Sequence, residues 1–152
     1  MLSGAQISKN KLYRYSLYRI WNKNLPKVLF IMLNPSKADS KKNDPTIRRV
    51  INFAKNWGFG GVYVGNLHCF ISTNPKEISI ENKFHREKNI QSIKKMFRKS
   101  KLIIYAWGNN RSTPSWLKMI IQDPYCIELN KNGIPKHPLY LRKNLIYKRL
   151  VL

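Results

Sequence analysis

Four short runs of apolar residues recur along the chain, and each is bounded by polar residues, glycine or proline. They occupy residues 28–33, 62–66, 102–107 and 125–129. The runs are too continuous for strands that face water on one side, and this pattern is typical of central parallel strands. Residues 12–21, which are rich in tyrosine, predict instead an antiparallel edge strand or hairpin.

Helical patterns separate these runs. Asp44 and Pro45 have the residue types of a helix N-cap and of a first helical position. Two further helices are predicted over about residues 80–99 and 115–121. The residues expected to face inward on the first helix are Ile47, Val50, Ile51, Ala54 and Trp57. The corresponding residues of the second helix are Phe84, Ile90, Ile93, Met96 and Phe97.

The order of these elements predicts an α/β fold. Strands that alternate with helices form a parallel sheet, and right-handed crossovers place the helices on both of its faces. We therefore expect a three-layer α/β/α sandwich with a central four-stranded parallel sheet. The chain has 152 residues, which is the size of one domain, and a single domain over residues 1–152 is predicted.

The charge of the chain is strongly unbalanced. It contains 29 Lys and Arg but only 7 Asp and Glu, and the net charge of +22 predicts a polyanionic partner. No acid precedes Asp39 or follows Glu128, so the basic residues dominate both ends of the chain. DNA is the first expectation for the partner. An acidic protein that mimics DNA is an alternative, and an anionic membrane surface matches less well.

Cysteine and histidine are too few to suggest a cofactor. Cys69 and Cys126 lie in apolar runs, which predicts buried thiols. Their spacing to the three histidines fits no metal motif, so neither a metal nor another cofactor is expected. No apolar run has the length of a membrane span, and we predict a cytoplasmic protein with no membrane partner.

Polar residues follow three of the predicted strands at their ends, which is where ligands bind in open α/β sheets. Asn34 follows the first strand, Asn66 ends the second and His137 follows the fourth. An amide suits the edge of a pyrimidine base, and a neutral imidazole stabilises a base that leaves as an anion. Taken alone, each asparagine is more typical of a turn. Together, the three residues predict one crevice at this edge of the sheet.

These residues resemble the motifs of the uracil-DNA glycosylase superfamily. Met32-Leu33-Asn34-Pro35-Ser36 is similar to the end of the first strand in the branches that carry asparagine, and Ala106-Trp107-Gly108 to the end of the third strand. His137 and Leu141 have the spacing of the family's histidine and leucine wedge. The resemblance implies a glycosylase-like fold. It also implies catalytic roles for Asn34 and His137, if the protein is active.

The same resemblance implies further binding residues. Its base-binding residues are Asn66, Trp107 and Asn109. Its DNA-binding face, with Leu141 as the wedge, also includes Ser36, Arg48, Arg49, Lys136, Tyr140, Arg142 and Lys143. The apolar tip 139–141 is expected to project from this face, and the alternative is that it packs onto the core of the domain.

The chain as a whole is more closely similar to a bacterial and phage family, domain of unknown function 1643. Members of that family occur in mobile cassettes, some of which also carry small acidic inhibitors of glycosylases. The motifs that carry this similarity span about residues 10–141. They are Leu33-Asn34-Pro35-Ser36, Asp44-Pro45-Thr46-Ile47-Arg48-Arg49, Trp57-Gly58-Phe59-Gly60-Gly61, Asn66-Leu67, Ala106-Trp107-Gly108-Asn109 and His137-Pro138-Leu139-Tyr140-Leu141.

Several departures from the active glycosylase pattern favour a degenerate enzyme. Position 34 carries no carboxylate, Leu139 stands where the family has a serine that clamps phosphate, and the aromatic residue that stacks on the base has no clear counterpart. We therefore expect a pseudo-glycosylase whose basic groove binds DNA or an acidic inhibitor protein. The alternatives are an active glycosylase for uracil or a modified pyrimidine, and a protein that binds small nucleotides.

Overall fold

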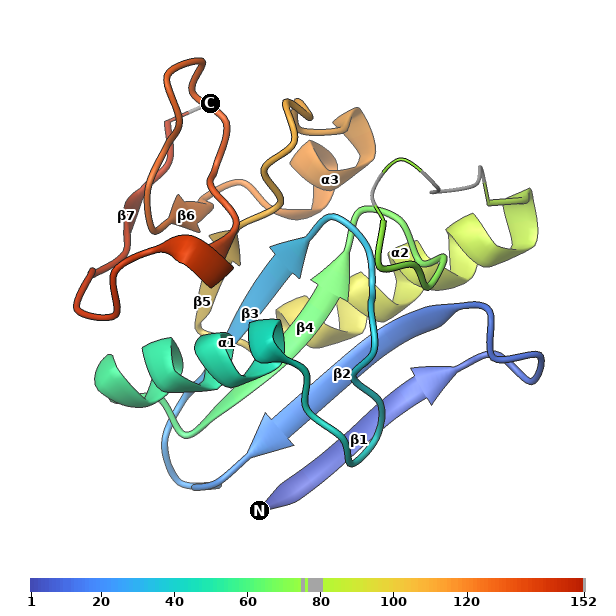
Figure 1. Cartoon of the computed structure of the whole chain (residues 1–152), viewed down its shortest axis with the longest axis horizontal. Coiled ribbons are helices and arrows are strands. Elements are labelled where there is room, and N and C mark those ends of the chain that lie inside the picture. Colours follow the sequence, from blue (N-terminus) through green and yellow to red (C-terminus); the bar gives the residue numbers. More distant parts are fainter. Residues whose placement is uncertain (75, 77–80, 152) are drawn as a thin grey trace.

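The computed structural model describes residues 1–74, 76 and 81–151, and within them the chain forms a seven-stranded sheet (Figure 1). Across the sheet the strands follow the order β1-β2-β4-β3-β5-β6-β7. Their bounds are β1 Leu2–Ile7, β2 Arg14–Ile20, β3 Lys27–Met32, β4 Gly61–Asn66, β5 Leu102–Tyr105, β6 Tyr125–Cys126 and β7 Lys148–Arg149.

The sheet is mixed, which confirms the α/β class and corrects the expected size of the sheet. The four predicted runs contain β3, β4, β5 and β6, which are parallel neighbours. These four strands are part of a larger sheet, however, because β1, β2 and β7 pair with it in antiparallel fashion, and of these three only β2 lies in a predicted segment. The sequence pattern did not reveal β1 or β7, since the side chains of β1 are exposed or half-buried and β7 has only two residues.

The tyrosine-rich stretch 12–21, predicted as an antiparallel edge strand or hairpin, contains the antiparallel strand β2, which forms a hairpin with the unpredicted β1. On its other side β2 pairs with β4, so β1 and not β2 is the edge strand. The register irregularity of the hairpin falls between Gln6 and Ile7, which pair with Ser16 and Arg14. Tyr15 is therefore an extra residue in β2, and such a bulge changes the face to which the following side chains point.

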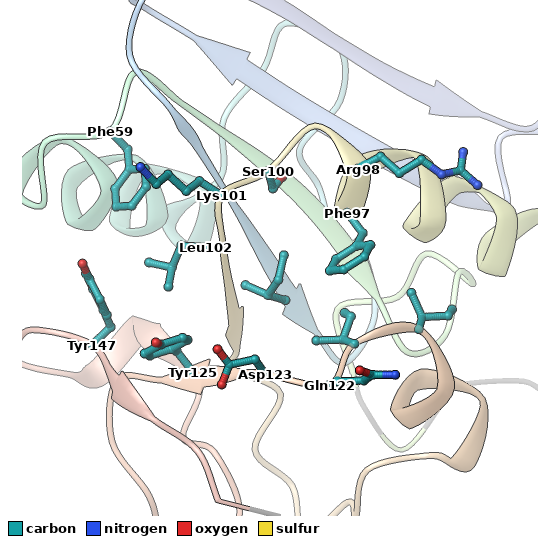
Figure 2. A pocket seen from close by; sticks show the side chains of 13 residues that line it. Phe59, Phe97, Arg98, Ser100, Lys101, Leu102, Gln122, Asp123, Tyr125 and Tyr147 are labelled. Atoms are coloured by element: carbon teal, nitrogen blue, oxygen red, sulfur yellow. The ribbon is translucent and has the colours of Figure 1, made fainter.

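Parallel strands give the sheet two different ends, which we call the amino edge and the carboxyl edge. The amino edge has a cavity of about 790 Å³ beside the starts of β5 and β6 (Figure 2). Aromatic side chains form much of its wall, namely Phe59, Phe97, Tyr125 and Tyr147. Its one carboxylate, Asp123, pairs with Arg149 at 3.2 Å. The residues predicted to carry chemistry are not among those that line this cavity.

Helices cover both faces of the sheet and complete three layers (Figure 1). The first helix, α1 (Pro45–Asn56), lies on one face, and α2 (Lys83–Arg98) and α3 (Ser115–Ile120) lie on the other. Asp44 is the N-cap of α1, as predicted, because its Oδ1 accepts a hydrogen bond from the backbone N–H of Ile47 at 2.9 Å.

The second helix differs in part from its prediction. Residue 80, where the helix was expected to start, lies outside the described residues, and the N-cap of α2 is Asn82. Ile93 and Met96 face the sheet as predicted. Phe84, by contrast, is 63% exposed and does not face inward. It lies in the first turn of the helix, where the Nζ atom of Lys88 is 5.7 Å from the centre of its ring.

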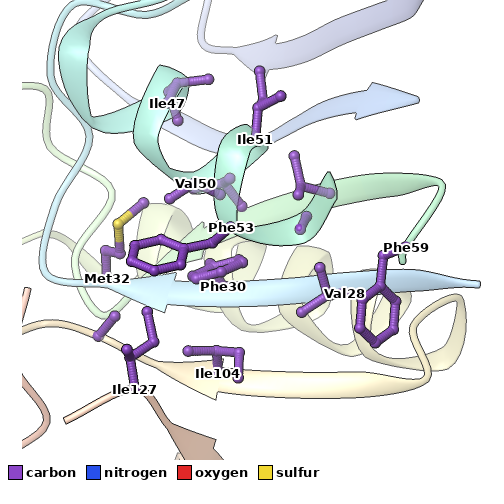
Figure 3. Close-up of a cluster of buried hydrophobic side chains, with 14 of the residues drawn as sticks. Val28, Phe30, Met32, Ile47, Val50, Ile51, Phe53, Phe59, Ile104 and Ile127 are labelled. Carbon is purple, nitrogen blue, oxygen red and sulfur yellow. The ribbon is translucent and has the colours of Figure 1, made fainter. Parts of the chain in front are cut away.

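The strands are apolar on both sides because each side packs against a helix. Val28 and Phe30 of β3 pack against Val50 and Phe53 of α1 (Figure 3). Residues of β3 that alternate with these, such as Leu29, pack toward α2 and α3. Cys69 and Cys126 are buried free cysteines, as predicted. No helix in the described part of the chain combines the length and the apolar character of a membrane span.

Candidate nucleic-acid interface

The predicted polar residues lie at the carboxyl edge. Beyond the ends of β3 and β4, the backbone N–H of Leu67 donates to the carbonyl of Met32 at 2.8 Å, and that of His68 to the carbonyl of Leu33 at 2.9 Å. Asn34 and Asn66 therefore lie on adjacent segments. Gly108 follows β5, and a β-carbon placed on it would lie 3.6 Å from the backbone nitrogen of His137. The segment that carries His137 thus reaches the same edge.

Asn34 fastens two loops together. Its side-chain Nδ2 donates to the carbonyl of Ser72 at 2.9 Å and to that of Pro35 at 3.1 Å. The backbone N–H of Ser72 in turn donates to the carbonyl of Pro35 at 2.9 Å. Both amide hydrogens of Asn34 are thus directed to backbone oxygens, which gives the residue a structural role at this edge.

Asn66 has an unpaired polar atom in the protein interior. The residue is only 2% exposed, and its side-chain Oδ1 has no hydrogen-bond partner among the described residues. The alternation of β4 places this side chain on the α1 face, together with Val62 and Val64. A buried acceptor without a donor costs about 1–3 kcal/mol. An N–H group of a bound ligand would remove this cost.

His137 is a neutral hydrogen-bond donor. It is the N-cap of the short 3₁₀ helix η2 (Pro138–Tyr140), and its Nδ1 accepts from the backbone N–H of Leu139 at 3.2 Å. A nitrogen that accepts carries no proton, so the proton of the neutral ring lies on Nε2. Burial lowers the pKa of His137, and the nearby Asp44 opposes this only in part.

The lowered pKa of His137 predicts a pH dependence of stability. In the unfolded chain the pKa of histidine is about 6.5, so below this pH the unfolded state binds a proton more readily than the folded state does. The free energy of unfolding therefore falls as the pH falls. The cost is at most about 1.4 kcal/mol per pH unit. His137→Asn keeps a cap acceptor and removes the titration. Urea unfolding at pH 7 and pH 5 is expected to show a smaller loss for this variant, and equal losses would contradict the assignment.

The tip of the loop after His137 is arranged differently from the prediction. Tyr140 is 91% exposed, whereas Leu141 is buried in the core beside α1 and does not project as a wedge. The reason is that η2 docks on α1, where Arg49 Nη1 donates to the carbonyl of Leu141 at 2.7 Å. Leu141 therefore packs onto the core of the domain, which was the alternative prediction for this tip, and Tyr140 is the side chain that projects into solvent.

The segment after β5 also departs from the prediction. Trp107 is fully buried, and its Nε1 donates to the carbonyl of Arg111 at 2.7 Å, so it packs in the core and does not face a ligand. Asn109 is exposed. Gly108, Asn109 and Asn110 have positive φ angles of 62°, 54° and 54°. Left-handed non-glycine residues are uncommon and concentrate at functional sites.

The predicted basic residues divide into exposed and half-buried ones. Arg48, Arg142 and Lys143 are exposed. Arg49 is occupied by the carbonyl of Leu141, and Lys136 pairs with Glu128 at 3.3 Å. Arg48 donates to the carbonyl of Asn43 in the loop before α1, whereas the docking of η2 on α1 joins Arg49 to the segment 136–143. A cavity of about 320 Å³ opens there, lined in part by His137, Tyr140 and Arg142.

Two buried arginines were not recognised in the sequence. Arg19 is 1% exposed and donates to the carbonyls of Asp39 at 2.6 Å and Lys42 at 3.1 Å. Arg14 is 2% exposed and donates to the carbonyl of Ala38 at 2.9 Å. Burial lowers the pKa of Arg14 to about 10, so it stays charged at neutral pH. The available signal was alternation, because Arg19 shares a face of β2 with the buried Leu17.

Carboxylates at this edge are already occupied. Asp44 accepts from the backbone N–H groups of Ile47 and Ala38, and Glu81 from the backbone N–H of Cys69 at 2.7 Å and from His68 at 3.3 Å. The described residues contain no group of three His, Cys, Asp or Glu that could hold a metal ion. Within that part of the chain, the edge presents amides, an imidazole and cations, and no free carboxylate.

The chain is thus an α/β domain with a mixed sheet whose carboxyl edge carries polar groups and cations. The profile of the family described as Protein of unknown function (DUF1643) matches residues 14–139, and the chain belongs to this family. No curated protein and no solved structure matches the chain.

Proposed function

We propose that this protein binds DNA through the carboxyl edge and is a catalytically degenerate relative of the uracil-DNA glycosylases. The relationship rests on the short motifs around Asn34, Asn66 and His137. The observation that carries the proposal is the unpaired, buried Oδ1 of Asn66 at an edge surrounded by cations. An amide in this position suits the N–H of a pyrimidine base, and the cations suit the phosphates of the strand that carries the base.

The charge distribution supports a polyanionic partner. The net charge of +22 far exceeds what solubility requires, and Lys136 and the exposed Arg142 line the same cavity as His137. Exposed Tyr140 adds an aromatic surface on which an unstacked base can lie. A small acidic protein that presents carboxylates in the spacing of DNA phosphates would compete for the same surface. Such a partner fits a cytoplasmic protein that is encoded by a bacterium, a phage or another mobile element.

Several contacts argue for a lack of efficient excision. A glycosylase activates a water molecule by accepting its proton, and Asn34, the residue aligned with that task, has a weakly basic amide in place of a carboxylate, with its N–H groups directed to Ser72 and Pro35. Trp107 is buried in the core and offers no stacking surface. The unstacking of a base costs a few kcal/mol, and stacking on the solvent-exposed ring of Tyr140 recovers less of that cost than an enclosed pocket would.

An active glycosylase is the second candidate because of His137. A neutral imidazole with its proton on Nε2 donates to an oxygen that becomes negative as a base leaves, without the cost of a buried cation. The same Asn66 amide would then hold the base. This candidate predicts release of free uracil or a modified pyrimidine.

An excision assay separates the two candidates. With oligonucleotides that contain uracil or hydroxymethyluracil, we expect binding without release of free base. We expect Asn66→Ala to weaken binding to the uracil oligonucleotide by about tenfold relative to a matched cytosine oligonucleotide, because cytosine lacks the ring N–H from which the Oδ1 of Asn66 would accept a hydrogen bond. Base release by the wild type that disappears in His137→Ala and Asn34→Ala would contradict degeneracy and support the active enzyme.

The stability of Asn66→Ala serves as the control. Since the Oδ1 of Asn66 has no donor within the described residues, its removal is expected to leave the free energy of unfolding unchanged or to raise it. A loss of several kcal/mol would show that Asn66 acts in folding, and the argument for a ligand at this position would fail.

A further inference from the structure

A second cavity at the carboxyl edge has a lining of unusual charge. It measures about 860 Å³ and lies between the tip of the β1–β2 hairpin and the loop that follows β3. The hairpin contributes Lys9 and Lys11, and the loop contributes Lys37 and Lys42. Asp39 is the one acid in the lining, and it already accepts hydrogen bonds from the backbone N–H groups of Lys41 and Lys42.

Two buried arginines hold the loop that follows β3, which forms one side of this cavity. Arg14 and Arg19 of β2 donate to the carbonyls of Ala38, Asp39 and Lys42. These contacts fix the backbone from which the lysine side chains extend. Buried hydrogen bonds to a charged group are among the stronger ones in proteins, so the backbone of the loop that carries Lys37 and Lys42 is firmly held.

The hairpin side is held in an unfavourable conformation. Lys11 has a φ angle of 63°, in the left-handed region that favours glycine. Its backbone N–H donates to the carbonyl of Ser8 at 2.9 Å, which closes the turn. A lysine at such a position costs stability, and residues of this kind cluster at ligand sites. Both sides therefore present ammonium groups from a defined backbone.

The residue types that line the cavity suit phosphate groups and not nucleobases. Its lining contains lysines and hydroxyl groups, including Ser36 and Ser72, but no aromatic or side-chain amide group. Ammonium and hydroxyl groups bind phosphate oxygens, whereas the faces and edges of bases require aromatic and amide partners. The volume exceeds that of one phosphate and is within the range of sites for small ligands.

We infer that this cavity is a binding site for a run of adjacent phosphates, supplied by a nucleic-acid strand that continues to Asn66 and His137. Asn34 connects the two places, since it lies two residues before Ser36 and donates to the carbonyl of Ser72. This inference rests on the proposed function for the source of the phosphates. The phosphate chemistry of the cavity itself stands on the lysines.

The test compares matched pairs of lysine substitutions. Lys9→Gln/Lys37→Gln removes one ammonium group from each side of the cavity, and Lys23→Gln/Lys101→Gln removes the same charge near the amino edge. Fluorescence anisotropy with a labelled oligothymidylate is measured over a range of salt concentrations, with inorganic tripolyphosphate as the competitor. For the cavity variant we expect binding about tenfold weaker at 0.15 M salt. Its log–log salt slope is expected to be shallower by about 1.4, at about 0.7 for each phosphate that a lysine no longer neutralises.

Each outcome decides one part of the inference. Weaker binding and the absence of tripolyphosphate competition in the cavity variant alone would support the site. Equal effects of both variants would overturn it and leave DNA binding intact. If the wild type binds tripolyphosphate through the cavity lysines but not the oligonucleotide, the phosphate site holds with free polyphosphate as its source, and the proposed function fails. Binding of neither probe would overturn both.

Discussion

Arg19→Met is expected to lower the free energy of unfolding by about 3 kcal/mol. Arg19 is buried in β2 and donates to Asp39, Lys42 and the side chain of Asn43. Methionine fills much of the same space without any donor, so these hydrogen bonds and a further one to the carbonyl of Tyr18 at 2.9 Å are lost, at a net cost of just under about 1 kcal/mol each. The measurement is equilibrium unfolding in urea, with the midpoint and the slope compared between variants.

Arg48→Met is the matched control for this prediction. Arg48 is an exposed arginine whose Nη1 donates to the carbonyl of Asn43 at 3.2 Å, in the same loop. Surface substitutions of this kind change stability by no more than about 0.5 kcal/mol. Equal losses of stability for the two variants would mean that the buried hydrogen bonds of Arg19 do not hold the loop. The inference that the cavity beside that loop is preformed would then lose its physical basis.

The sequence predicts those elements whose side chains are buried on a regular period. The four apolar runs contain strands, and the cap signal of Asp44 and Pro45 begins α1, because burial on both faces of a sheet and capping are local in sequence. β1 has no such pattern, since its side chains are exposed or half-buried and its backbone pairing with β2 defines it. Edge strands of this kind depend on a partner elsewhere in the chain.

The candidate site is predictable in its location but not in its contacts. The polar residues at strand ends lie at one edge because parallel strands end together, which follows from strand order alone. The burial of Leu141 depends on the docking of η2 against α1, a contact between residues more than 90 positions apart. Arg14 and Arg19 were missed for a similar reason. Charged residues are normally exposed, and only the backbone acceptors of a distant loop make their burial favourable.

Salt-dependent binding of duplex DNA is the most direct test of the central claim, that the carboxyl edge binds nucleic acid. Arg48→Gln/Lys136→Gln/Arg142→Gln removes three cations at this edge, namely Arg48 in the first turn of α1, and Lys136 and Arg142 in the lining of the cavity that contains His137. Lys23→Gln/Arg98→Gln/Lys101→Gln removes three near the amino edge, where Figure 2 shows Arg98 and Lys101. Because the first variant would leave about three phosphates without a cation, we predict a log–log salt slope shallower by about 2.7 and, at 0.15 M salt, binding about a hundredfold weaker. The second variant is predicted to change both quantities little, and equal losses of affinity in the two variants would contradict the account.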